Sequence, residues 1–394
     1  MTSSSFRSGN VSDDYQEESG ILDSQKLEDQ LIQSFDDLTA KSSKARLLAF
    51  ETIRKNLTQK CMTDLLYSRK ITILDSLSRC IKRGKGQDLG YAASLISIIC
   101  ATIGSSPETD SIFSELVSIL LNLLEDRTVS AEVRTRCART ISICTYIIGI
   151  MGYLEQVMDR LFAIFNASCA KGDGTMPNPS ESIASLHAAS LNAWALLLTA
   201  LHAASPQVAL DMIEEHFDKI TELLDSPHLD LKIAAGETLA IMCELIREQN
   251  DELTADDFDE LCDKLRDLVT VAQKSRGKKD MRQQRSNFRE ILATIEENES
   301  PSVIIKFGRE RLVLETWSRR RQYDAFCELF GTGINQHLTE NEVLRDIFGL
   351  GAVIIHLDLP RVKRSDTNYE NMIADKNRTK NLRRLRDKRA DVID

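Results

Sequence analysis

The sequence predicts a mainly α-helical protein, a HEAT/armadillo-like α-solenoid with a small α+β C-terminal module and a basic C-terminal helix. Gly and Pro are scarce, at 17 and 7 of 394 residues, about half their average combined usage of about 12%. Apolar residues at helical spacing continue from about residue 23 to about residue 300. A residue pair that ends in alanine recurs along these helices at a nearly constant interval.

The recurring pair indicates a repeat. Its alanines are separated by 44, 45, 51 and 46 residues, and the longest interval contains a segment with loop composition, 171–182. Small residues let neighbouring helices approach closely, and periods of about 40–47 residues are typical of HEAT and armadillo proteins. The five pairs are Leu48-Ala49, Ala92-Ala93, Cys137-Ala138, Ala188-Ala189 and Ala234-Ala235.

Helices are predicted wherever apolar residues recur at i, i+3 and i+4. Pro107, Pro206 and Pro301 lie where a helix should start or stop. The clearest segments are 43–58, 88–103, 108–125, 130–148, 152–168, 182–204, 207–225, 229–249, 255–273 and 279–298.

One of these segments has the composition of a membrane span. Residues 182–210 contain no charged side chain, and about 20 apolar residues suffice to cross a bilayer. The run also holds His187, Asn192 and His202, and Pro206 divides it. We therefore expect a helix buried on most sides of a soluble protein rather than a transmembrane helix.

The spacing of apolar residues changes after Pro301. Val303–Phe307 and Arg311–Thr316 are predicted strands around Gly308, followed by a helix from Ser318 to Phe330 and a turn at Gly331–Gly333. A short helix near Glu340–Phe348 and a strand-like Ala352–Leu357 complete a module that we expect to cap the solenoid. The predicted domains are a disordered acidic and Ser-rich N-terminus at 1–22, the repeat domain at 23–300, the α+β module at 301–360 and a basic tail at 361–394.

The net charge of −10 conceals strong segregation. Residues 41–90 carry 12 basic and 4 acidic groups, whereas 211–270 carry 5 and 18. Such asymmetry suggests separate surfaces for separate partners. Nine cysteines and a start without the pattern of a secretory signal favour a reducing compartment.

We find no signature of an enzyme, a metal site or a cofactor. No glycine-rich loop has the spacing of a nucleotide-binding motif, and no Cys-x2-Cys or His-x3-His pair occurs. Cys137 and Cys144 share a helix face within an apolar stretch, which predicts core cysteines. No histidine has a recognisable nucleophile as partner. The sequence therefore predicts no catalytic, cofactor-binding or metal-binding residue.

Two basic features are candidates for nucleic-acid binding. The first is a stripe at i, i+4, i+7 and i+11 of one helix, for which a solvated face is the alternative: Lys278, Arg282, Arg285 and Arg289. The second lies between residues 376 and 389, where eight of fourteen residues are basic. Its basic residues are Lys376, Arg378, Lys380, Arg383, Arg384, Arg386, Lys388 and Arg389.

The second feature, which we call the basic segment, contains only Leu382 and Leu385 as apolar residues. It cannot dock by hydrophobic burial alone, so we expect it to order on an anionic partner. A nuclear-import signal and a solubilising tail are alternatives. Attraction to a membrane surface would be weak without apolar anchors.

The C-terminal sequence resembles the interferon-related developmental regulators. The likeness rests on Ile305–Trp317 (IKFGRERLVLETW), Tyr323–Phe326, Asn341–Gly351 (NEVLRDIFGLG) and Leu385–Val392 (LRDKRADV), and it extends over the helical array. The resemblance implies a non-enzymatic regulator with an armadillo-like domain. It also implies binding to translationally inactive ribosomes, with a C-terminal helix, here about Asp375–Asp391, entering channels lined by rRNA.

A second activity that the resemblance implies is transcriptional co-regulation through corepressor complexes during differentiation. The expected partners are thus the ribosome, through rRNA and ribosomal proteins, or corepressor proteins. We expect a monomer in the cytoplasm and the nucleus, without a small-molecule substrate and without membrane insertion.

Overall fold

The computed structural model describes residues 25–249, 258–270 and 278–353. Residues 1–353 form one compact unit and residues 354–394 form a second. The account below concerns the described part of the first unit. The predictions for residues 1–22 and for the basic segment lie outside the described residues.

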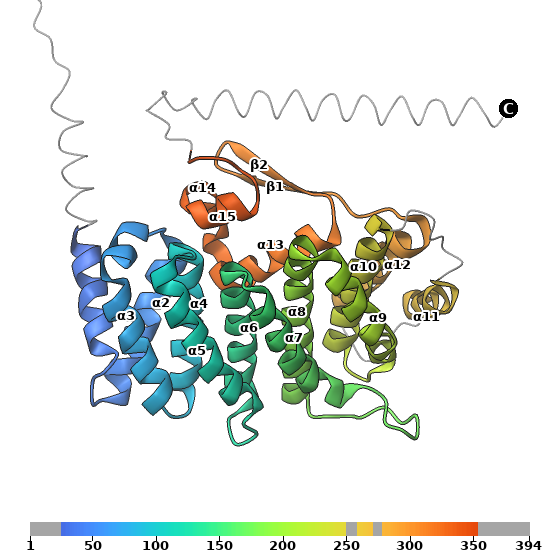
Figure 1. Cartoon of the computed structure of the whole chain (residues 1–394), viewed down its shortest axis with the longest axis horizontal. Coiled ribbons are helices and arrows are strands. Elements are labelled where there is room, and N and C mark those ends of the chain that lie inside the picture. The colour runs from blue at the N-terminus through green and yellow to red at the C-terminus, as the bar shows by residue number, and fades with distance from the viewer. Residues whose placement is uncertain (1–24, 250–257, 271–277, 354–394) are drawn as a thin grey trace, which may run out of the picture. The chain divides into compact units, whose positions relative to one another are not determined.

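Two layers of helices alternate along the chain, after a helical stretch at 25–37 (Figure 1). Each even-numbered helix packs on the next even-numbered helix, and we call this set the even layer. It comprises α2 (Ser43–Gln59), α4 (Gln87–Ile103), α6 (Ala131–Ile148), α8 (Glu181–Ala204), α10 (Leu229–Gln249) and α12 (Lys278–Glu297).

The odd layer packs against one side of the even layer. It comprises α3 (Thr63–Arg83), α5 (Pro107–Glu125), α7 (Met151–Phe165), α9 (Pro206–Glu222) and α11 (Asp259–Thr270). Short 3-10 turns, η1 (Asn166–Ser168) and η2 (Leu223–Asp225), extend α7 and α9. Pairs of helices stacked in two layers confirm the predicted solenoid.

The repeated alanines explain the stacking. Ala49, Ala93, Ala138, Ala189 and Ala235 all lie in the even layer and all are buried. A methyl group at each position lets successive even helices pack closely, since a larger side chain would hold them apart. The period read from the sequence is therefore the period of the even layer.

Helix α8 confirms the expectation of a buried apolar helix. It is the one helix in the described ranges that is long and apolar enough to cross a membrane. However, 78% of its most apolar window is buried inside the protein. Its neighbours are α6, α7, α9 and α10, which surround it on several sides.

The C-terminal module comprises β1 (Val303–Phe307), β2 (Glu310–Leu314), α13 (Trp317–Phe330), η4 (Gly331–Gly333), α14 (Ile334–Glu340) and α15 (Glu342–Ile347). The strands pair antiparallel, with Val303 opposite Leu314 and Phe307 opposite Glu310. Leu312 and Leu314 are buried on one face, as the period of two predicted.

Several predicted boundaries in the module are wrong. The second strand was expected to reach Thr316, but it ends at Leu314 because the Thr316 side chain caps α13 by accepting from the Arg319 N–H. Helix α14 was not predicted. Ala352 and Val353 are not in a strand, and the remainder of the predicted Ala352–Leu357 strand lies outside the described residues.

Candidate functional site

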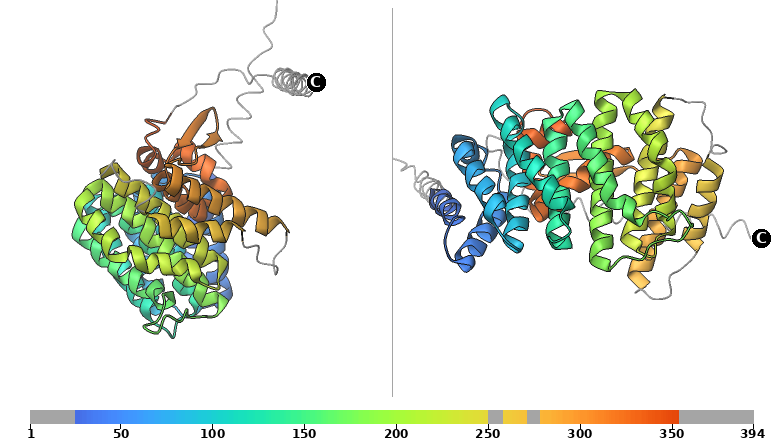
Figure 2. Two further views of the ribbon diagram at one scale, coloured as in Figure 1. Left: turned by 90° about the vertical axis from the view of Figure 1, so that its right-hand side faces the viewer. Right: turned by 60° about the horizontal axis from the view of Figure 1, so that its bottom comes forward.

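The module lies along the even layer instead of covering one end of the array. Helix α13 contacts α10, α8, α4 and α2, while α14 contacts α2 and α15 contacts α4. Figure 1 shows α13 to α15 beside the helical array, and the orange segments of the module lie along one side of the array in Figure 2. The chain thus turns back after α12 and runs toward its own N-terminal repeats.

The segment that runs back toward the N-terminal repeats is held at its start, in α13, by a buried carboxylate. Glu244 of α10 accepts hydrogen bonds from the backbone N–H of Trp317 at 2.8 Å, and from the N–H and hydroxyl of Ser318 at 3.2 and 2.8 Å. These are the first two N–H groups of α13, which have no partner within the helix. Burial raises the pKa of Glu244, and the three hydrogen bonds act in the opposite direction. The side chain fixes where α13 starts.

Further contacts follow in reverse order along the array. The Trp317 indole N–H donates to the Thr294 hydroxyl of α12 at 2.7 Å. Gln322 donates to the Thr199 hydroxyl of α8 at 3.0 Å. The Phe326 ring packs edge-on against Tyr146 of α6. Successive turns of α13 therefore contact successive even helices.

Two fully buried side chains anchor the far end. His337 Nε2 lies 3.0 Å from the Leu57 carbonyl of α2, and Asn341 Nδ2 donates to the Ala101 carbonyl of α4 at 2.9 Å. The Asn341 side-chain oxygen also caps α15 by accepting from Val343 N–H. Burial lowers the pKa of His337 to about 4, so the imidazole is neutral and donates through Nε2.

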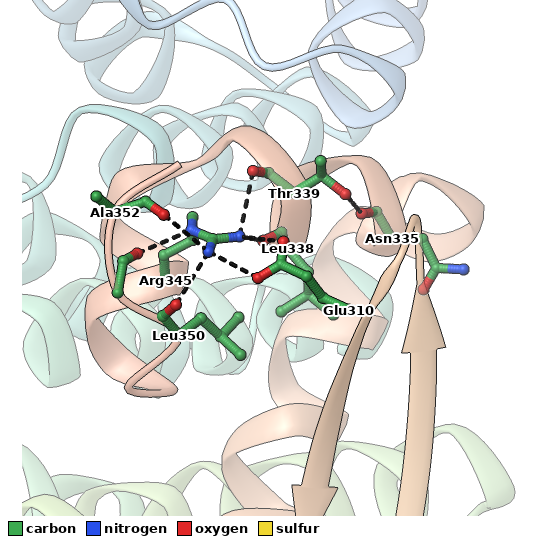
Figure 3. Close-up of polar contacts among 8 residues, drawn as sticks. Glu310, Asn335, Leu338, Thr339, Arg345, Leu350 and Ala352 are labelled. Carbon is green, nitrogen blue, oxygen red and sulfur yellow. Dashed lines mark hydrogen bonds and ion pairs between the residues drawn. The ribbon is translucent and has the colours of Figure 1, made fainter. Parts of the chain in front are cut away.

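Arg345 organises the end of the module (Figure 3). Its guanidinium is 1% exposed and makes two hydrogen bonds of 2.9 Å with the Glu310 carboxylate of β2. The same group donates to the backbone carbonyls of Leu338, Thr339, Leu350, Gly351 and Ala352. A paired, multiply hydrogen-bonded guanidinium fits the geometry that buried arginines require. It fixes the chain up to the residues that precede position 354.

The predicted nucleic-acid-binding residues are only partly described. The helix that was expected to carry the first stripe is present as α12. Arg289 is exposed on it, next to the buried Phe288. The side chains of Lys278, Arg282 and Arg285 lie outside the described residues, as does the whole basic segment. Both features therefore stay predictions.

The buried cysteines and histidines are packed inside the protein. Cys137 and Cys144 are fully buried, which confirms the prediction of core cysteines, and burial raises the pKa of Cys137 to about 12. A Ser168–His187 pair at 2.6 Å was not predicted, because 19 residues separate its members. Ser168 is 1% exposed, so no substrate can reach its hydroxyl. Among the described residues no cluster suited to a metal ion occurs.

Comparison with known proteins decides the family. A family model for interferon-related developmental regulators matches residues 1–296, and a model for the interferon-related protein conserved region matches 341–390. The chain belongs to the interferon-related developmental regulator family. It is 36% identical to mouse interferon-related developmental regulator 2 over 374 residues, covering 94% of this chain and 84% of that protein. With human interferon-related developmental regulator 1 the identity is 35% over 381 residues, with the same coverage.

Solved structures with similar folds include an engineered protein, with a TM-score of 0.41 and 12% identity. The alignment covers 69% of this chain and 98% of the engineered protein. A designed armadillo repeat protein has a TM-score of 0.37 and 16% identity, covering 66% and 99% of the two chains. Membership of the family implies a regulatory role in development, and neither the relatives' names nor the repeat fold indicates a catalytic activity.

The two family matches lie on either side of the segment that joins α12 to α15. The first ends at residue 296 near the end of α12, and the second begins at Asn341, the residue that anchors α15 to α4. The second match continues to residue 390 and so includes all eight basic residues of the basic segment. In this family the anchored end of the module and the basic segment thus belong to one matched region.

Proposed function

We propose that this protein binds translationally inactive ribosomes and regulates translation, with the basic segment in contact with rRNA phosphates. The observation that carries the proposal is the concentration of eight basic residues within fourteen positions, in a region matched as a unit to the family. Lysine and arginine that neutralise phosphates release counterions, which supplies affinity without a hydrophobic surface.

The described structure supports this role through the module that precedes the basic segment. Arg345 and Asn341 hold the chain against the array up to residue 352. The basic segment is therefore tethered to a fixed point of the described structure, which lies 24 residues before Lys376. The acidic 211–270 stretch would face basic ribosomal proteins or solvent. The stripe on α12 would add a second phosphate contact through residues such as Arg289.

Co-sedimentation with purified 80S ribosomes tests the proposal. The wild-type chain should appear in the ribosome fraction at low salt. Reversing four charges of the basic segment should reduce that fraction at least tenfold, because repulsion replaces attraction at each position. The variant is Arg383→Glu, Arg384→Glu, Arg386→Glu and Arg389→Glu.

A matched control reverses four exposed basic residues of the array and leaves the basic segment intact: Lys44→Glu, Lys55→Glu, Lys60→Glu and Arg69→Glu. It carries the same change in net charge, so an effect of total charge alone would weaken both variants equally. Wild-type protein absent from the ribosome fraction at low salt would contradict the proposal.

The alternative is a nuclear scaffold for corepressor proteins, in which the basic segment serves import. Affinity purification with and without RNase separates the two functions. Recovery of ribosomal subunits supports ribosome binding. Recovery of corepressors alone, unchanged by RNase, supports the scaffold. In that case deletion of 376–394 would move the protein out of the nucleus without loss of its protein partners.

A further inference from the structure

A cavity of about 320 Å³ lies between α13 and the even layer. Four arginines line it: Arg54 from α2, Arg136 and Arg139 from α6, and Arg321 from α13. Among the described residues that line it, Glu328 of α13 is the one acidic side chain. The volume is at the lower end of the range for small-molecule sites, and the lining has a clear excess of positive charge.

The single carboxylate is shared by two of these arginines. Glu328 lies 3.1 Å from Arg139 Nε and 3.0 Å from Arg321 Nη2. The Arg321 side chain is 7% exposed, and its Nε is buried without a hydrogen-bond partner. An unpaired donor on a buried cation is costly, so the cavity holds a guanidinium whose hydrogen bonds are incomplete.

The other two arginines add charge that Glu328 does not balance. Arg136 pairs with Glu132 at 2.8 Å, outside the cavity lining, and lies over the Tyr91 ring at 4.6 Å. Arg54 is exposed and makes no ion pair or hydrogen bond with any described residue. A guanidinium keeps its charge at all physiological pH values. The lining therefore carries more positive than negative charge, while Glu237 and Asp324 near Arg321 and Glu132 beside Arg136 offset part of it.

The serine and threonine hydroxyl groups of the lining already donate hydrogen bonds within the protein. Ser94, Ser97, Thr140 and Ser142 each donate to a backbone carbonyl, at 2.9 to 3.0 Å. Asn192 contributes a buried side-chain oxygen that has no partner. The lining also carries the Tyr91 hydroxyl and the Asn192 amide as donors, but the guanidinium groups are its charged donors, so a ligand that supplies acceptors and negative charge fits it.

We propose that this cavity binds a compact anion that carries two or more phosphate groups. Guanidinium forks match phosphate oxygens in a bidentate manner. The four arginines come from three helices, and a ligand with several phosphate groups offers acceptor oxygens to more of them at once. The bound anion would complete the hydrogen bonds of Arg321 and join α13 to α2 and α6.

Such a bridge stabilises the returned position of α13, because a ligand that binds only the docked state raises its population by mass action. The site thus offers a small-molecule control over the module that precedes the basic segment. No sequence spacing predicted it, since Arg54 and Arg321 are far apart in the chain and meet only through the return of α13.

Isothermal titration calorimetry with inorganic tripolyphosphate tests the site at 150 mM salt. The full-length chain carries the four charge reversals of the basic segment, so that the segment does not compete for the probe. We expect saturable binding that the additional change Arg54→Gln with Arg139→Gln weakens at least tenfold. Both side chains are exposed, so this variant should fold, which circular dichroism verifies.

The matched control is Arg69→Gln with Arg127→Gln, which removes two exposed arginines away from the cavity and should change the affinity less than twofold. Tripolyphosphate should also raise the unfolding midpoint of the parent chain and not that of the Arg54/Arg139 variant. Absence of saturable binding, equal binding by that variant, or equally tight binding of citrate would each overturn the proposal.

Discussion

At the residue scale, single side chains of the module donate hydrogen bonds to carbonyls at helix ends. Leu57 and Ala101 lie within the last four residues of α2 and α4, whose carbonyl groups have no partner inside the helix. His337 and Asn341 provide those partners from positions 280 and 240 residues later in the chain. The module therefore completes the hydrogen bonding of repeats that lie much earlier in the chain.

Replacing Asn341 by alanine should lower the free energy of unfolding by about 2–4 kcal/mol. The change removes the α15 cap and leaves the buried Ala101 carbonyl without a donor. Chemical denaturation measures the loss. Asn335→Ala, at an exposed position of α14, is the matched control and should remain within about 0.5 kcal/mol of wild type. Equal stability of the two variants would contradict the anchoring role.

His337 makes stability depend on pH in a defined direction. Burial lowers its pKa from 6.5 to about 4 in the folded protein. The unfolded chain therefore binds a proton more readily between these values, and the contribution of His337 to stability, present above pH 6.5, is lost as the pH falls toward 4. Buried Glu244 has a raised pKa and acts in the opposite sense, so wild type alone does not isolate the histidine.

Comparison with His337→Gln isolates it. The variant should be less stable than wild type at pH 7, and the difference in unfolding free energy should shrink by up to about 3 kcal/mol by pH 4. Denaturant titrations at pH values between 4 and 7 give this difference. A difference that is constant with pH would show that the histidine is not held neutral.

At the element scale, the sequence predicted the repeat because one physical requirement recurs. Close packing of successive even helices demands a small buried residue at the same place in each, and alanine supplies it from Ala49 to Ala235. Helix α14 was missed for a related reason. It follows Gly331 and Gly333, which read as a turn, but Gly333 is needed because a Cβ there would lie 1.7 Å from the Thr58 carbonyl oxygen. A contact between distant segments determines that glycine, so no local pattern could predict it.

The even layer should not tolerate a larger residue at a repeat position. Ala138→Leu places three extra carbons between α6 and its neighbours at a site with no exposed surface, and overpacking of this kind costs about 1–3 kcal/mol. Thermal denaturation should show a clearly lower midpoint. Ala203→Leu, on an exposed position of α8, makes the same substitution without burial and should leave the midpoint nearly unchanged.

At the scale of the whole molecule, the return of the module determines which surfaces remain available. Side chains from α13 to α15 cover part of the even layer, from Thr294 of α12 to Leu57 of α2. This arrangement could not be predicted, because the residues that define it pair across 23 to 280 positions of the chain. The family and the basic segment could be predicted, since both depend on local motifs and charge density. Contacts of the basic segment with RNA remain a proposal.

The salt dependence of ribosome binding tests that proposal most directly. If half of the eight basic residues meet phosphates, the slope of log affinity against log salt should be about −3 to −4. The affinity of the full chain for purified ribosomes, measured from 50 to 300 mM salt, gives the slope. The four-charge reversal should flatten it. A wild-type slope near zero, or the same slope in the variant, would contradict the central role of the basic segment.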